Sequence, residues 1–290
     1  MADGGSPLVQ RRRLRTELRK ERQLRGLTQE QVAAEMDWSL SKIIRIEGGS
    51  SGISANDLKA LLRLYEVTEP ERVSSLLVLA RAARERSWWS AYSNVAPPLL
   101  LQLIEYESVA SAVRQFESMF IPGILQTEDY ARAVIQDYFD ERSGSDRLRA
   151  LVDLRIRREE LLDSENPPLF QFMLDEAAVR RVVGGYSIMR GQLRRLIEVA
   201  EHANVTLEII PFSAGLHPGM KGPFEIIDFA DPADSDIVFL ESPRGDIISD
   251  DPEETLRYRE AFARLVKVSL GPRESLALLT RIAEEMSQPG

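Results

Sequence analysis

Cysteine is absent from the sequence, and histidine occurs only twice in 290 residues, at His202 and His217. The absence of cysteine excludes a disulfide framework, a thiolate metal site and a cysteine nucleophile. Two histidines do not favour a histidine-rich metal centre or a histidine-driven catalytic dyad. Dinucleotide-binding, P-loop and zinc-protease motifs are missing as well. The sequence therefore predicts a protein that is not an enzyme, with no catalytic residues, no metal ligands and no cofactor.

Long apolar runs are also missing. No apolar segment approaches the ~18 residues of a membrane-spanning helix, and the polar N-terminus lacks the apolar core of a signal peptide. We therefore expect a cytoplasmic protein without a membrane partner. Apolar residues nevertheless make up 43% of the chain, which is enough for a packed core in one or two domains.

Charge is distributed unevenly along the chain. The formal net charge is −9, yet residues 1–86 carry 16 basic and 12 acidic side chains, a balance of +4. The remaining residues carry 21 basic and 34 acidic side chains, a balance of −13. This asymmetry predicts two domains with different partners, and the basic domain is a candidate for binding phosphate backbones. The alternative is a basic surface that is only solvated.

Two segments are expected to mark the domain boundaries. Residues 1–10 are rich in glycine and other small residues and predict a flexible tail. Residues 87–98 (SWWSAYSNVAPP) predict a linker, because the closing Pro-Pro pair cannot continue a helix. These segments separate a first domain at 11–86 from a second domain at 99–290.

Apolar periodicity predicts mostly helices, with strands only in the second domain. The first domain is expected to hold five helices that begin near residues 11, 28, 39, 54 and 69. In the second domain, helices are expected near 99–119, 127–139, 145–163, 187–203, 253–268 and 272–287. Strands are expected at 169–174, 205–211, 224–229 and 236–241. The predicted fold class is mainly α, with an α+β C-terminal domain.

Residues 27–47, LTQEQVAAEMDWSLSKIIRIE, carry the strongest pattern in the sequence. Thr28 and Ser39 are suited to cap two short helices, and Ala33 is small where those helices cross. Two short helices with a tight break between them match a helix-turn-helix, whose second helix enters the major groove of DNA. The residues of that helix expected to face DNA, together with its cap, are Ser39, Leu40, Ser41, Lys42 and Arg45.

The segment from Leu14 to Val67 resembles the five-helix bundle of lambda-repressor-like (XRE) helix-turn-helix domains. The resemblance implies that Gln29 reaches a phosphate or a base edge of a double-stranded operator. Thr28 lies at a helix N-terminus, where backbone amides favour phosphate. Asp37 departs from the family pattern, because glycine usually supplies the left-handed turn residue there. Asp tolerates that conformation better than most residues.

The resemblance also separates structural from DNA-contacting charges. Arg22 and Glu47 match positions that form an internal ion pair in such domains. Arg45 is a candidate for bidentate contact with guanine, and a surface salt bridge is its alternative. The basic run at residues 11–15 is either an arm to phosphates or a solvated tail.

Residues 88–285 resemble the C-terminal domain of antitoxin-like transcriptional regulators of filamentous soil bacteria. The matching motifs are Trp88-Trp89, FIPGILQTEDYA at 120–131, LDEA at 174–177 and the segment 205–212. In that family, the same type of helix-turn-helix precedes the domain, and a neighbouring gene commonly encodes a small partner protein. The resemblance therefore implies a partner-binding domain without naming its ligand.

The candidate partner or ligand region comprises Trp88, Trp89, Pro122, Gly123, Gln126 and His217. Structural alternatives remain open for each part of it. The two tryptophans are suited to pack the domains together, the Pro-Gly pair is suited to end a helix, and the histidine lies in a glycine-rich loop typical of a long hairpin.

Two functional hypotheses follow from these patterns. The first is a sequence-specific transcriptional regulator that binds its operator as a homodimer, because one short helix contacts too few base pairs for a unique site. Its acidic C-terminal domain would dimerise and bind a small basic protein, as an antitoxin does. The alternative is a regulator that responds to a small molecule held in the C-terminal domain.

Overall fold

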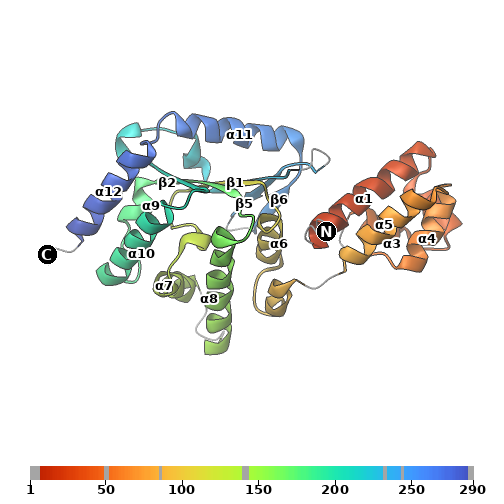
Figure 1. Ribbon diagram of the computed structural model, residues 1–290, viewed down its shortest axis with the longest axis horizontal. Helices are drawn as coiled ribbons and strands as arrows, with labels where there is room; N and C mark the ends of the chain where they lie inside the picture. Colours follow the sequence, from red (N-terminus) through yellow and green to blue (C-terminus); the bar gives the residue numbers. More distant parts are fainter. Residues whose placement is uncertain are drawn as a thin grey trace. The chain divides into compact units, whose positions relative to one another are not determined.

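The computed structural model describes residues 7–48, 52–84, 87–138, 144–230, 234–242 and 245–286. The chain divides into two compact units, Met1–Ser90 and Ala91–Gly290. The first unit holds five helices with a helix-turn-helix, and the second is an α+β unit built on a six-stranded sheet (Figure 1). The fold class predicted from the sequence is therefore confirmed.

The expected tail and linker are partly wrong. The first helix begins at Pro7, so residues 7–10 are helical, while residues 1–6 lie outside the described part of the chain. The division between the units falls inside the expected linker, but a short 3-10 helix, η1 (Trp88–Tyr92), occupies much of that segment.

The helices of the first unit are α1 (Pro7–Leu24), α2 (Gln29–Glu35), α3 (Leu40–Glu47), α4 (Ala55–Leu64) and α5 (Pro70–Ala82). They surround one apolar core, which includes Leu18, Val32, Ile43, Leu58 and Tyr65. These residues recur at helical spacing in the sequence, so each helix contributes one apolar face to the core.

Thr28 and Ser39 cap the two helices around the turn, as the sequence predicted, and Ser54 caps the next helix. The hydroxyl of Thr28 accepts a hydrogen bond from the backbone N–H of Gln31, whose side chain accepts one in return from the Thr28 backbone, forming a capping box. Ser39 caps α3 and Ser54 caps α4 in the same manner, without the return bond. Each cap satisfies backbone donors that the first turn of a helix leaves unpaired.

Asp37 supplies the turn between α2 and α3 with a backbone φ of 54°, in the left-handed region. We expect Asp37→Val to lower the free energy of unfolding of this unit by about 1–2 kcal/mol, because a β-branched side chain fits that conformation poorly. Asp37→Gly, which fits it freely, should stay within about 1 kcal/mol of the wild type. Native-state hydrogen exchange of the α2 and α3 amides in the full chain measures both values. Equal losses in the two variants would contradict the role of backbone conformation.

The second unit is built on a mixed sheet with the strand order β3-β2-β1-β4-β5-β6. The strands are β1 (Ala112–Glu117), β2 (Leu169–Asp175), β3 (Val205–Ile210), β4 (Phe224–Asp228), β5 (Ile237–Leu240) and β6 (Ile247–Ser249). The pairs β1–β2 and β2–β3 are parallel, and the pairs β1–β4, β4–β5 and β5–β6 are antiparallel.

Helices cover both faces of the sheet, and Figure 1 shows α11 on one side with α6, α8 and α10 on the other. The helices are α6 (Pro98–Glu107), α7 (Glu128–Tyr138), α8 (Ser145–Glu159), α9 (Glu176–Arg180), α10 (Tyr186–Val199), α11 (Pro252–Val266) and α12 (Pro272–Glu285). The core under α11 includes Phe116, Phe224 and Phe262, whereas α10 and α12 pack over β2 and β3 on the other face.

The expected helix at 99–119 is wrong in its second half. Helix α6 ends at Glu107, and Ala112–Glu117 forms the central strand β1. Because both sheet faces are covered, Val113 and Phe116 are both buried although they point to opposite faces. The simple apolar–polar alternation of a half-buried strand is therefore missing there. Strand β6 was not predicted, and the expected strands match β2 to β5 within a few residues.

Candidate functional site

The outer surface of α3 is the candidate DNA-binding surface. Leu40, Ser41, Ile44 and Arg45 are exposed along it, while Ile43 and Ile46 are buried in the core. Ile44 was not among the residues predicted to face DNA, although its side chain is 48% exposed. Helical spacing does predict this exposure, because Ile44 lies four residues after the exposed Leu40 and therefore on the same side of the helix. The surface thus combines two aliphatic side chains, a hydroxyl and a guanidinium.

Thr28 and Ser39 both lie exposed at helix N-termini, where each side-chain oxygen already serves as a cap. The hydroxyl of Thr28 lies 3.2 Å from the Gln31 nitrogen, and that of Ser39 lies 3.3 Å from the Lys42 nitrogen. Their structural role is therefore present without DNA, and their contact with phosphate stays a prediction.

A buried charge network fixes the end of α3 to α1. Arg22 Nε donates to Glu47 Oε1 at 2.8 Å, and Arg22 Nη2 donates to Glu47 Oε2 at 3.0 Å. This pairing raises the pKa of Arg22. The Gln29 amide also donates to Glu47 Oε2, at 2.8 Å. The side chain expected to reach DNA is thus held by an internal hydrogen bond, which a DNA contact through the same nitrogen would have to replace.

The ammonium of Lys42 is engaged within the domain. It lies 3.1 Å from a carboxylate oxygen of Asp57 and 3.6 Å from the centre of the Trp38 ring. Trp38 thus supplies a cation–π partner for Lys42. The sequence predicted that Lys42 faces DNA and indicated neither of these two contacts. Both side chains of the ion pair are about one-third exposed, so the pair contributes little stability and can open toward a phosphate.

Two arginines of α1 bind helix ends within the domain. Arg11 donates to the carbonyl of Ala83 at 3.1 Å, and Arg15 donates to the carbonyl of Gly48 at 3.3 Å. These carbonyls lie at the C-terminal ends of α5 and α3, where the helix dipole favours positive charge. The basic segment therefore stabilises the end of the helix that is expected to contact DNA.

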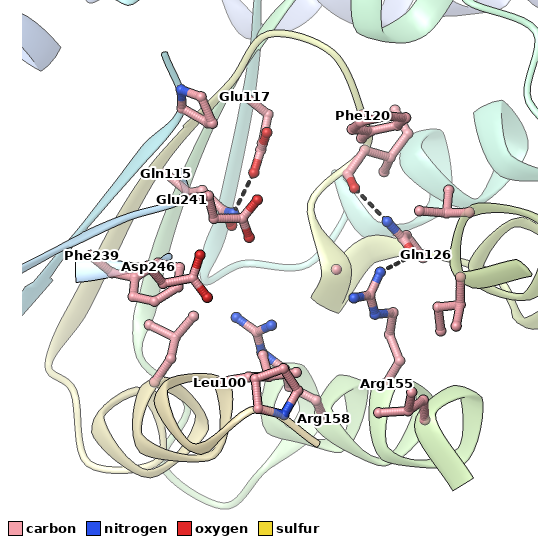
Figure 2. A pocket seen from close by; sticks show the side chains of 18 of the residues that line it. Leu100, Gln115, Glu117, Phe120, Gln126, Arg155, Arg158, Phe239, Glu241 and Asp246 are labelled. Atoms are coloured by element: carbon pink, nitrogen blue, oxygen red, sulfur yellow. Dashed lines mark hydrogen bonds between the residues drawn. The ribbon is translucent and has the colours of Figure 1, made fainter. Parts of the chain in front are cut away.

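The second unit contains a cavity of about 650 Å³ between the sheet and helices α6 and α8 (Figure 2). Its apolar wall includes Leu100, Leu103, Ile104, Phe120, Leu151 and Phe239. Charged side chains line the same space, with Glu117, Glu241 and Asp246 on the sheet side and Arg155 and Arg158 from α8. A concave, mostly apolar space with a few polar groups is typical of a small-molecule site.

Arg158 is paired inside this unit. Its guanidinium donates to both carboxylate oxygens of Glu107, with Nε to Oε2 at 2.6 Å, and its Nη2 lies 3.8 Å from Glu225 Oε2. All three side chains are almost fully buried. Burial and the charge of Glu107 raise the pKa of Glu225 well above its usual range. One guanidinium therefore lies against two carboxylates.

The sheet wall of the cavity is rich in hydrogen-bond acceptors. The Gln115 amide nitrogen donates to Glu117 Oε1 at 3.0 Å, and burial together with the charge of Glu241 raises the pKa of Glu117 to about 8. Desolvation against the cavity wall and the charge of Asp246 raise the pKa of Glu241. Across the cavity, burial and the neighbouring Arg158 lower the pKa of Arg155 to about 10.

Only part of the region predicted from the sequence meets at this cavity. Gly123 and Gln126 line it, and Pro122 immediately precedes them. His217 lies elsewhere: it is buried, 3.1 Å from a carboxylate oxygen of Asp175, and packs edge-on against Phe116 in the core under α11.

The tryptophans of the predicted region belong to the other unit. Trp88 and Trp89 lie within Met1–Ser90 and pack edge-to-face, with ring centres 5.5 Å apart. The prediction from the sequence did not include the charged residues of the cavity. Glutamate is rarely buried, so a glutamate within a strand that is buried on both faces, such as Glu117, indicates a functional or paired side chain.

In the part of the chain that the structure describes, no helix is long and apolar enough to cross a membrane. In the same part of the chain, no cluster of three or more potential ligands is arranged to hold a metal ion.

Comparison with known proteins gives two family matches. A family model for a helix-turn-helix domain matches residues 13–74, and one described as "Domain of unknown function (DUF5753)" matches residues 100–281. Glutamate 5-kinases of Streptococcus thermophilus strains CNRZ 1066 and ATCC BAA-250 / LMG 18311 are each 29% identical over 144 residues, which is 45% of this chain and 54% of theirs. The chain thus spans about half the length of the curated relatives it matches. No solved structure matches it.

Proposed function

We propose that this chain is a sequence-specific transcriptional regulator, because it belongs to the DUF5753 family and carries a helix-turn-helix domain before its DUF5753 domain. The helix-turn-helix supports a DNA-binding regulator. The observation that carries the proposal is the exposed face of α3, held rigid by the Ser39 cap and the Arg22–Glu47 pair. Such a protein acts in the cytoplasm, on the nucleoid.

The operator is expected to have two half-sites. One helix of eight residues contacts only a few base pairs, so a unique site requires a homodimer with half-sites about one helical turn apart. Binding of the purified full chain to its own upstream DNA, compared with random duplex of the same length, tests the proposal. Equal affinity for the two duplexes would contradict sequence-specific binding.

Operator affinity is expected to fall steeply with salt. Each phosphate neutralised by a lysine or arginine contributes about −0.9 to the slope of log K against log salt. Two copies each of Lys42 and Arg45 would then contribute a slope of about −4. A titration from low to moderate salt, read by fluorescence anisotropy, gives the slope. A slope near zero would show that these cations do not neutralise phosphates.

Two regulatory roles are proposed for the second unit. Its cavity favours a small effector molecule, because apolar walls and buried charged groups meet there. The acidic balance of −13 beyond residue 86 favours a small basic protein encoded by a neighbouring gene, with which the chain would form an antitoxin-like complex. Co-purification with that gene product tests the second role. The partial likeness to kinases supports no catalytic proposal, because it covers about half of those enzymes.

A further inference from the structure

The cavity of the second unit has an excess of acid groups. Its lining and the charged groups directly behind it comprise the carboxylates Glu107, Glu117, Glu225, Glu241 and Asp246 and the guanidiniums Arg147, Arg155 and Arg158. Five potential negative charges therefore stand against three positive ones in surroundings of low polarity. This excess favours the protonated form of the buried Glu117, whose pKa is raised to about 8.

The guanidiniums are already held by the protein. Arg158 is bound on two sides by Glu107, and Arg155 Nη1 donates to Gln126 Oε1 at 2.9 Å. Gln126 is fixed in turn, because its amide nitrogen donates to the carbonyl of Ile121 at 2.7 Å (Figure 2). Arg155 and Arg158 are therefore each hydrogen-bonded within the protein.

The acceptors of the sheet wall have fewer partners. Gln115 is buried and lines the cavity, and its Oε1 accepts no hydrogen bond from any residue that the structure describes. Its amide nitrogen lies 3.0 Å from Glu117 Oε1. Within the described ranges, no arginine or lysine lies at ion-pair distance from Glu117 or Glu241. Figure 2 shows these three side chains together at one side of the cavity.

An ammonium group matches this set, because it has three N–H donors and no acceptor. We propose that the cavity binds a small organic amine with an apolar body, whose ammonium donates hydrogen bonds to the carboxylates of Glu117 and Glu241. Leu100, Leu103 and Phe239 would contact the apolar body. The cavity volume of about 650 Å³ lies within the range of roughly 300–1,000 Å³ typical of ligand sites. The idea that the amine regulates DNA binding rests on the proposed function, whereas the binding itself does not.

The test compares three probes of similar shape: 2-phenylethylamine, 2-phenylethanol and phenylacetate. Each is titrated into the full chain without DNA, and binding is followed by NMR chemical-shift changes. We expect the amine to bind at least tenfold more tightly than the alcohol, because charge-assisted hydrogen bonds are about twice as strong as neutral ones. The carboxylate should bind more weakly still. Glu117→Gln should reduce amine affinity at least tenfold while leaving alcohol affinity unchanged.

Controls separate this inference from folding and from DNA binding. Glu241→Gln, at an accessible position, should have the same effect if Glu117→Gln does not fold, and Glu253→Gln on α11 should change nothing. Alcohol binding as tight as amine binding, tightest binding of phenylacetate, or no saturable shift with any probe would each overturn the proposal. Operator binding of the same preparation is measured separately. Its loss with amine binding intact would contradict the regulator, and the reverse result would contradict only the amine site.

Discussion

Replacing Glu47 with alanine is expected to lower the free energy of unfolding of the N-terminal unit by up to about 3–5 kcal/mol, because it leaves a largely buried guanidinium without its counter-charge. Glu47 is 2% exposed and accepts hydrogen bonds from Arg22 and Gln29. Among the residues that the structure describes, Arg22 keeps one hydrogen bond outside this network, from Nη1 to the carbonyl of Leu27 at 2.7 Å. Native-state hydrogen exchange of α1 and α3 amides in the full chain measures the loss.

Two control variants show whether the effect comes from the ion pair. Glu35→Ala removes an exposed carboxylate from α2 and should change stability by no more than about 0.5 kcal/mol. The double change Arg22→Met with Glu47→Leu should recover part of the loss, because apolar side chains can replace a buried ion pair. A loss below about 1 kcal/mol for Glu47→Ala would mean that Arg22 finds water or another acceptor, and that the pair does not hold α3 in place.

Local chemistry explains why the first unit could be predicted well. Helix caps at Thr28 and Ser39 depend on residues only three positions away, so the sequence itself contains both partners of each bond. The left-handed turn at Asp37 is equally local. Partners farther along the chain were harder to predict: helical periodicity placed Lys42 near the outer face of α3 but did not indicate that Asp57, on α4, would bind its ammonium.

The second unit shows the same limit on a larger scale. Strand β1 was predicted as helix because its identity depends on neighbours on both sides, β2 at residues 169–175 and β4 at residues 224–228. The pairing of β1 with β4 places Gln115 opposite Glu225, although more than a hundred residues separate them. No pattern within one segment encodes that juxtaposition. The family resemblance led to Gly123 and Gln126, which do line the cavity, but not to the acid groups opposite them.

Replacing Arg45 with alanine is expected to weaken operator binding by about 1–3 kcal/mol per half-site, because a bidentate guanidinium–guanine contact is worth that much in discrimination. For a homodimer with two half-sites the loss doubles, which corresponds to roughly thirtyfold or more in affinity. Arg45 is exposed in the last turn of α3, beside Ser41 and Ile44 on the same surface. Fluorescence anisotropy on operator and random duplex measures the change.

A second substitution at this position separates base contact from phosphate contact. Arg45→Lys keeps the charge but loses the planar pair of donors, so it should keep the salt slope and lose most of the preference for operator over random duplex. Arg81→Ala, on an exposed position of α5, controls for the loss of one positive charge and should leave the preference unchanged. If Arg45→Ala weakens binding to both duplexes equally, Arg45 contacts phosphate, and base recognition comes from other side chains, with Leu40, Ser41 and Ile44 on the exposed face of α3 as candidates.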